Sequence, residues 1–284
     1  MLVITSNATA APATCKVAAR RHHGGMGAID TNRGAIGVVE SGGGDATPIV
    51  FLHGVGSDKS VWSPQLAHFG QSRRAVAFDY PGYGDSEPAP DATRDDFAAA
   101  IRAAMDSLTI DRAHICGLSL GGVIAIALHA IAPDRCASLI LADSFAVHPD
   151  GQAIFDRSEA ASRTIGMRAL AEARAGALLG AAASPAIHRE VIDTMSRIDP
   201  AAYVIGAQAV WLANQVERAR SIDVPTLVLV GDEDSITPPS LSEHLATLIE
   251  GAQLEVIAGA GHIANLEQSL AFNAAIDRFL SKID

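Results

Sequence analysis

The sequence carries its clearest signal at residues 114–122, which read His114-Ile115-Cys116-Gly117-Leu118-Ser119-Leu120-Gly121-Gly122. An apolar, strand-like run passes here through Gly-x-Ser-x-Gly into a helix-favouring run over 123–130. In such a motif the serine sits on a sharp strand-to-helix turn that pushes its hydroxyl out over the sheet. The glycines suit this turn because a side chain there would collide with neighbouring backbone. The motif therefore predicts that Ser119 is a nucleophile.

Two later loops carry the other residue types that a serine nucleophile needs. The apolar run 227–230 is followed by Gly231-Asp232-Glu233-Asp234, and the strand-like run 253–257 is followed by Gly259-Ala260-Gly261-His262. A serine hydroxyl becomes a good nucleophile when an imidazole removes its proton, and a carboxylate then orients that imidazole. Because loops at the carboxyl ends of parallel strands meet at one crevice, we expect these loops to lie near Ser119.

Four motifs together resemble the α/β-hydrolase superfamily, from about residue 28 to the C-terminus. Besides the serine turn and the histidine loop, the chain contains sequences similar to the oxyanion loop, Phe51-Leu52-His53-Gly54-Val55-Gly56-Ser57, and to the Asp-x-Pro-Gly-x-Gly-x-Ser turn, Phe78-Asp79-Tyr80-Pro81-Gly82-Tyr83-Gly84-Asp85-Ser86. Within the superfamily, the 3-oxoadipate enol-lactonase and carboxylesterase group is most similar, through Val224-Pro225-Thr226 and Gly261-His262-Ile263-Ala264-Asn265-Leu266-Glu267-Gln268.

The resemblance implies an α/β fold, namely the α/β-hydrolase fold. It has a mostly parallel central sheet flanked by helices, with a helical cap inserted before the strand that bears the acid. We expect the core at 26–147 and 220–284, and the cap at 148–219, where an Ala-rich, helix-favouring run replaces the strand pattern. Residues 1–25 are predicted to be a poorly ordered N-terminal extension.

Carried over residue by residue, the resemblance implies that Ser119 is the nucleophile, His262 the general base and acid, and Asp234 the carboxylate that orients His262. The family pattern has its acid three residues after the strand-end glycine, which favours Asp234 over Asp232 and Glu233. Asp143 is the reserve candidate, because it follows the apolar run 139–142, where some hydrolase branches keep their acid.

Backbone N–H groups are the expected oxyanion donors. The resemblance implies those of Val55, in the loop after His53, and of Leu120, next to the nucleophile. His53 and Asp79 are expected to have structural roles.

The substrate pocket has several candidate residues. Trp62 and Trp211 are candidates for its apolar walls, with core packing as the alternative. Three cap arginines are candidates to bind a substrate carboxylate, with helix-surface pairing as the alternative: Arg163, Arg168 and Arg174.

Composition limits the partners and the compartment. The 284 residues have a formal net charge of −11, without the clustered Lys and Arg that nucleic acid requires. No unbroken apolar run reaches the roughly 18 residues of a membrane span. Cys15, Cys116 and Cys136 are an odd set, which argues against a disulfide framework and favours the cytoplasm. We expect a monomer or a homodimer.

Neither a metal ion nor a cofactor is predicted. The histidines outside the motifs lack metal-ligand spacing, and the glycine run 42–44 lacks the Lys and Ser/Thr of a phosphate cradle.

These residues predict a serine hydrolase that cleaves a small carboxylic ester or lactone through an acyl-enzyme. An enol-lactone of the 3-oxoadipate type is the leading substrate. A C–C bond hydrolase and a cofactor-free perhydrolase are the alternatives within the fold. A ligand-binding receptor on a hydrolase scaffold is the alternative from another class, because a fold alone does not establish turnover.

Overall fold

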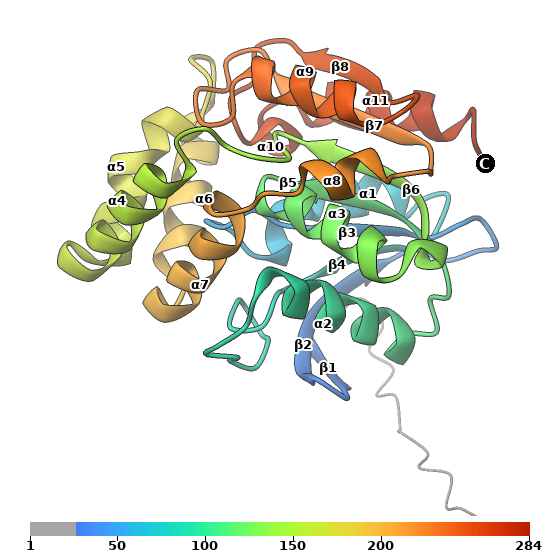
Figure 1. Cartoon of the computed structure of the whole chain (residues 1–284), viewed down its shortest axis with the longest axis horizontal. Coiled ribbons are helices and arrows are strands. Elements are labelled where there is room, and N and C mark those ends of the chain that lie inside the picture. The colour runs from blue at the N-terminus through green and yellow to red at the C-terminus, as the bar shows by residue number, and fades with distance from the viewer. Residues whose placement is uncertain (1–26) are drawn as a thin grey trace, which may run out of the picture.

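A central sheet of eight strands organises the protein, in the order β1-β2-β4-β3-β5-β6-β7-β8 (Figure 1). The computed structural model describes residues 27–284, so the predicted extension 1–25 lies outside the described residues. Strand β2 pairs antiparallel with β1 and with β4, and every other pairing in the sheet is parallel. The strands are β1 Gly27–Thr31, β2 Gly34–Ser41, β3 Ile49–Leu52, β4 Ala75–Phe78, β5 Ala113–Leu118, β6 Cys136–Ala142, β7 Thr226–Gly231 and β8 Gln253–Ile257.

Helices cover both faces of this sheet (Figure 1). One face packs against α2 Arg94–Ser107, α3 Leu120–Ile131, α8 Val216–Arg220 and α9 Pro239–Leu248. The other face packs against the short helix η1 Lys59–Trp62, α1 Ser63–Phe69, α10 Ala264–Glu267 and α11 Ser269–Leu280. A second short helix, η2 Pro133–Arg135, precedes β6. The predicted mostly parallel sheet flanked by helices is confirmed.

The apolar strand sequences follow from this two-sided burial. Successive side chains of a strand point to opposite faces of the sheet. In β3, Val50 and Leu52 belong to the core under α2 and α3, whereas Ile49 and Phe51 belong to the core under α1 and α11. All four are fully buried, which explains why β3 is apolar throughout instead of alternating.

Four further helices lie between β6 and β7 in sequence and gather at one end of the sheet, at the left of Figure 1. They are α4 Gly151–Thr164, α5 Gly166–Leu178, α6 Pro185–Ser196 and α7 Pro200–Trp211. The segment that carries these helices begins and ends at adjacent residues, because Val147 and Asn214 form an antiparallel bridge. Beside it, the side-chain Nε2 of Gln215 donates to the Val123 carbonyl at 2.7 Å. All four helices fall inside the predicted cap, 148–219; the division into two domains stays a prediction.

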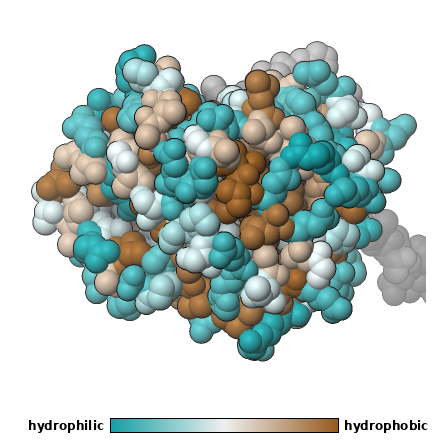
Figure 2. Space-filling model, turned by 90° about the horizontal axis from the view of Figure 1, so that it is seen from above, coloured by the Kyte–Doolittle hydropathy of each residue, from teal (hydrophilic) through white to brown (hydrophobic). Residues whose placement is uncertain are grey.

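The face seen in Figure 2 is mostly hydrophilic, with apolar side chains gathered near its middle. Among residues 27–284, no helix combines the length and the apolar character needed to cross a membrane. Cys116 and Cys136 are buried free thiols, and Cys15 lies outside the described residues.

Candidate active site

Ser119 lies on a strained turn between β5 and α3. Its backbone has φ of 55° and ψ of −112°. Residues other than glycine rarely adopt a positive φ. The turn is possible because its flanking glycines approach other backbone closely. A Cβ at Gly117 would overlap the Gly121 carbonyl, and a Cβ at Gly121 would overlap the Leu52 carbonyl. Strain of this kind persists only where the surroundings enforce it, and it is typical of functional sites.

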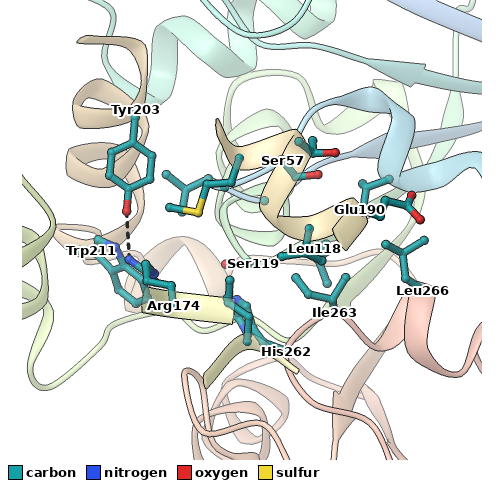
Figure 3. Close-up of a pocket in the computed structure, with 18 residues that line it drawn as sticks. Ser57, Leu118, Ser119, Arg174, Glu190, Tyr203, Trp211, His262, Ile263 and Leu266 are labelled. Carbon is teal, nitrogen blue, oxygen red and sulfur yellow. Dashed lines mark hydrogen bonds between the residues drawn. The ribbon is translucent and has the colours of Figure 1, made fainter. Parts of the chain in front are cut away.

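The Ser119 hydroxyl faces a pocket shared with His262 (Figure 3). The serine is 2% exposed, and its Oγ has no hydrogen-bond partner within the described part of the chain. A buried hydroxyl without a partner is unusual, because most buried polar groups are hydrogen-bonded. The structure therefore leaves the oxygen of Ser119 free for a reactant.

His262 is held by a buried carboxylate. Its Nδ1 lies 2.8 Å from Asp234 Oδ2 and 3.2 Å from Thr237 Oγ1. Asp234 Oδ1 accepts from the amides of Ile236 and Thr237, at 2.8 and 2.9 Å. The Thr237 hydroxyl donates to Oδ2 at 2.6 Å. Because a carboxylate only accepts, Nδ1 carries the proton, and Nε2 is left with a lone pair.

The surroundings keep Asp234 ionised. Burial by itself would raise the pKa of this carboxyl, but His262, the Thr237 hydroxyl and the Thr237 amide outweigh burial and lower the pKa below the ordinary 3.8. The reserve candidate, Asp143, behaves differently: burial and then the charge of Asp234 raise its pKa well above 3.8. The hydrogen bond to His262 belongs to Asp234 and not to Asp143.

The loop after β3 borders the same pocket through Gly54 and Val55. Burial lowers the pKa of His53, so its ring is neutral, and Nδ1 donates to the Gly54 carbonyl at 2.8 Å. In a planar trans peptide the N–H points opposite to the carbonyl. His53 therefore turns the Val55 N–H away from itself. Among residues 27–284, neither the Val55 nor the Leu120 amide has a hydrogen-bond acceptor.

His53 and Asp79 belong to a buried polar cluster behind this loop. Asp79 accepts from the Lys59 amide at 2.8 Å and from Lys59 Nζ at 2.6 Å, and the same Nζ donates to Asp85 at 2.6 Å. These contacts join the loop after β3 to the turn after β4.

The pocket encloses about 630 Å³ of empty space, part of it open to solvent. Its lining is mostly apolar and comes from both the core and helices α5–α7, including Val61, Leu118, Leu178, Val191, Met195, Trp211, Ile263 and Leu266. Such a lining with a few polar groups is typical of small-molecule sites.

One of the two predicted pocket tryptophans lies elsewhere. Trp211 lines the pocket and stacks on Phe145, with ring centroids 5.8 Å apart. Trp62 does not line this pocket, and the alternative of core packing holds: the residue is fully buried and stacks on Phe51 at 4.9 Å. Its indole lies between Phe51 of β3 and Phe272 of α11.

The three candidate arginines also differ in position. Arg163 pairs with Glu159, and Arg168 pairs with Glu172 and Asp193, all on the surface. Arg174 lines the pocket instead, and its Nη1 donates to the Tyr203 hydroxyl at 2.9 Å (Figure 3). Within the described part of the chain Arg174 has no carboxylate partner, although Glu190 also lines the pocket.

Sequence reasoning missed Tyr203 and Thr237, and it did not separate Arg174 from the other arginines. Spacing offers a signal for the arginine: Arg163 and Arg168 each have an acidic residue four positions away, which predicts surface pairing, whereas Arg174 has none. Tyr203 and Thr237 carry no comparable signal, because only the fold brings them to the site.

The sequence profile of the alpha/beta hydrolase family matches residues 49–275. The chain belongs to this family. As an α/β hydrolase it resembles 3-oxoadipate enol-lactonase 1 of Acinetobacter baylyi, with 28% identity over 241 residues, 84% of this chain and 90% of that protein. A carboxylesterase of Bacillus subtilis is 28% identical over 268 residues, 89% of this chain and 86% of that protein.

A solved structure agrees with these relatives. The enol-lactonase from Burkholderia xenovorans LB400 superposes with a TM-score of 0.84 at 30% identity, covering 89% of this chain and 99% of that one. The predicted resemblance to the enol-lactonase and carboxylesterase group of α/β hydrolases is confirmed.

Proposed function

We propose that the protein is a serine hydrolase that cleaves a small carboxylic ester or lactone through an acyl-enzyme on Ser119. One observation carries the proposal. Ser119 Oγ, which has no hydrogen-bond partner within residues 27–284, shares a pocket with a histidine whose Nδ1 is bonded to the buried carboxylate of Asp234. This is the arrangement that serine nucleophiles need, with a base for the hydroxyl proton and a carboxylate that fixes the base.

The proposed reaction starts at the substrate carbonyl. Ser119 Oγ forms a bond to the carbonyl carbon while His262 Nε2 takes the hydroxyl proton, and Asp234 stabilises the resulting imidazolium. The oxyanion accepts from the Val55 and Leu120 amides, each worth about 2.7 to 4 kcal/mol in a comparable site. His262 then protonates the departing alkoxide or enolate oxygen. Water, deprotonated by His262, attacks the acyl-enzyme and frees Ser119.

An enol-lactone of the 3-oxoadipate type remains our leading substrate. The relatives named enol-lactonases support it, and so does Arg174, a half-buried residue on the pocket wall that has no carboxylate partner among residues 27–284. A guanidinium binds a carboxylate through two parallel hydrogen bonds. We therefore expect a substrate that carries a carboxylate beyond the scissile ester. Its product would leave as an open-chain acid.

Turnover of a substrate panel tests this proposal. The panel pairs five- and six-membered lactones with and without a carboxylate, and adds p-nitrophenyl esters, the enol-lactone and a C–C hydrolase substrate. Wild type should hydrolyse esters or lactones, with higher kcat/KM for the carboxylated member of each pair. Ser119→Ala should lose at least about 10³-fold in kcat.

Ser138→Ala is the matched control, because Ser138 is a buried serine on β6 that does not line the pocket. It should keep the activity of the wild type. Tight binding of panel members without turnover would favour the receptor instead. Activity confined to the C–C substrate, or to peroxide-dependent chemistry, would favour the alternatives within the fold. The cytoplasmic location and the monomeric or homodimeric state stay predictions.

A further inference from the structure

Residues 178–181 comprise the last residue of α5 and the turn that follows it, and we call them the cap turn. The cap turn lies directly against the loop that carries His262. The His262 amide donates to the Leu178 carbonyl at 2.9 Å. The two backbones are so close that a Cβ at Gly261 would lie 2.5 Å from the Gly180 nitrogen. The main chain of the histidine is therefore bonded to the cap side of the pocket as well as to the core.

A single carboxylate joins these two segments. Glu267, at the end of α10, accepts from the Gly180 amide through Oε2 at 2.7 Å. Its Oε1 accepts from the Gly261 amide at 3.0 Å and from the Ile263 amide at 3.3 Å. Gly261 and Ile263 are the neighbours of His262 on either side. Glu267 thus holds the backbone before and after the histidine, and ties both to the cap turn.

A neighbouring glutamate, Glu233, bonds through its side chain to the cap turn but, among residues 27–284, not to the backbone on either side of His262. Glu233 Oε2 bonds to the Ala181 amide, the next residue of the same cap turn. No hydrogen bond joins the Glu233 side chain to residues 261–263 within the described part of the chain. The pair of glutamates therefore separates two effects: fastening the cap turn, and fastening the loop of His262.

We propose that Glu267 is a positioning residue for His262, which uses three backbone amides to set the imidazole between Ser119 and Asp234 and to register it against the cap turn. The inference rests on the proposed function, because it assigns to Glu267 the placement of the proposed base. Glu267 itself does not line the pocket, and its side chain bonds to backbone amides only within the described part of the chain.

The chemistry of the side chain makes the inference specific. A carboxylate accepts hydrogen bonds at both oxygens, whereas an amide has one accepting oxygen and one donating nitrogen. In Glu267→Gln, the side-chain NH₂ group would replace one of the two accepting oxygens. This donor would then face the backbone N–H of Gly180, or those of Gly261 and Ile263, with no acceptor between them. Either the cap turn or the histidine loop must then move. A misplacement of about 1 Å in a catalytic group can cost about 10²-fold in rate.

Steady-state kinetics of full-length Glu267→Gln and Glu233→Gln test the inference, with the best ester or lactone of the panel. Glu267→Gln should lower kcat at least about tenfold with KM within about threefold of wild type, because the base is displaced while the pocket remains. Glu233→Gln should keep both constants within about threefold. Thermal melts identify the folded variants.

Several outcomes would overturn the inference. They are a Glu267→Gln variant with wild-type kcat, a change confined to KM, or equal kcat losses in both variants, which would indicate general loosening of the cap. If Glu267→Gln does not fold, Glu267→Asp decides by the same criterion, because its shorter carboxylate cannot span all three amides. A wild type without turnover, or an active Ser119→Ala, would overturn the proposed function and this inference with it.

Discussion

Asp143 and Asp234 are two buried carboxyls at the ends of neighbouring strands, and their surroundings favour opposite protonation states. At Asp143, burial and then the charge of Asp234 raise the pKa, and Oδ2 has no partner within the described part of the chain. At Asp234, burial is outweighed by the charge of His262 and by hydrogen bonds from His262 and Thr237, which lower the pKa of the carboxyl. The surroundings favour the neutral form of Asp143 and the ionised form of Asp234, whose charge an imidazolium at His262 would need.

Asp143→Asn should therefore change stability in a pH-dependent way. A carboxyl whose pKa is raised on folding contributes stability that is complete below its unfolded pKa and is lost as pH rises through the folded pKa. Asparagine has no proton to lose. The difference in Tm, variant minus wild type, should thus grow more positive from about pH 5 to about pH 8, as measured by thermal melts at constant ionic strength.

Asp95→Asn is the control for this measurement, because Asp95 on α2 is bonded to the guanidinium of Arg218, far from Asp143 and His262. The hydrogen bond and the charge of Arg218 lower the pKa of Asp95 on folding, so its contribution is complete above the ordinary 3.8 and is lost only as pH falls through the lower folded value. Its Tm difference should stay constant over the same range. A pH-independent difference for Asp143→Asn would show that Asp143 is ionised in the folded protein.

Individual residues differed in how far the sequence predicted them. Ser119, His262 and Asp234 were predictable positions because each follows a strand-like run in a recognisable motif; the structure places Ser119 and His262 on one pocket, with Asp234 bonded to His262. Trp62 was misplaced because its sequence position, just after the oxyanion loop, does not reveal the direction of an indole on a short helix. Thr237 was missed because its contact with Asp234 depends on a local turn.

At the level of elements, the proposed mechanism uses the loop after β3 and the turn before α3 together, because their backbone amides and not their side chains are the proposed oxyanion donors. Val55 lines the pocket, and the proposed donor is its amide. Gly54 lies close to the nucleophile: a Cβ there would lie 3.5 Å from Ser119 Cβ.

Gly54→Val and Val55→Ala should consequently have unequal effects. The branched side chain at 54 would push against Ser119 and displace the following amide, so kcat should fall by about 10² or more, the cost of losing one oxyanion donor. Val55→Ala keeps the backbone, and kcat should stay within about threefold. Steady-state kinetics on the best panel substrate make the comparison. Equal losses would contradict a backbone role.

At the scale of the whole molecule, the resemblance to the α/β-hydrolase superfamily predicted the sheet and its layers, and the apolar runs of the central strands agree with it, because burial on both faces makes β3, β5, β6 and β7 largely apolar. Composition was also sufficient to predict that residues between β6 and β7 form helices. Their arrangement over the pocket was not predictable, because it depends on which face each helix buries and on long-range contacts such as that between Gly180 and Glu267.

The central claim is that Ser119 forms a covalent intermediate, and the most direct measurement is mass spectrometry of the protein after reaction with an organophosphate ester. The account predicts one phosphoryl adduct per chain, mapped to the peptide that contains Ser119, with parallel loss of hydrolysis and no adduct in Ser119→Ala. An adduct at another residue, or an active enzyme that remains unlabelled, would contradict it.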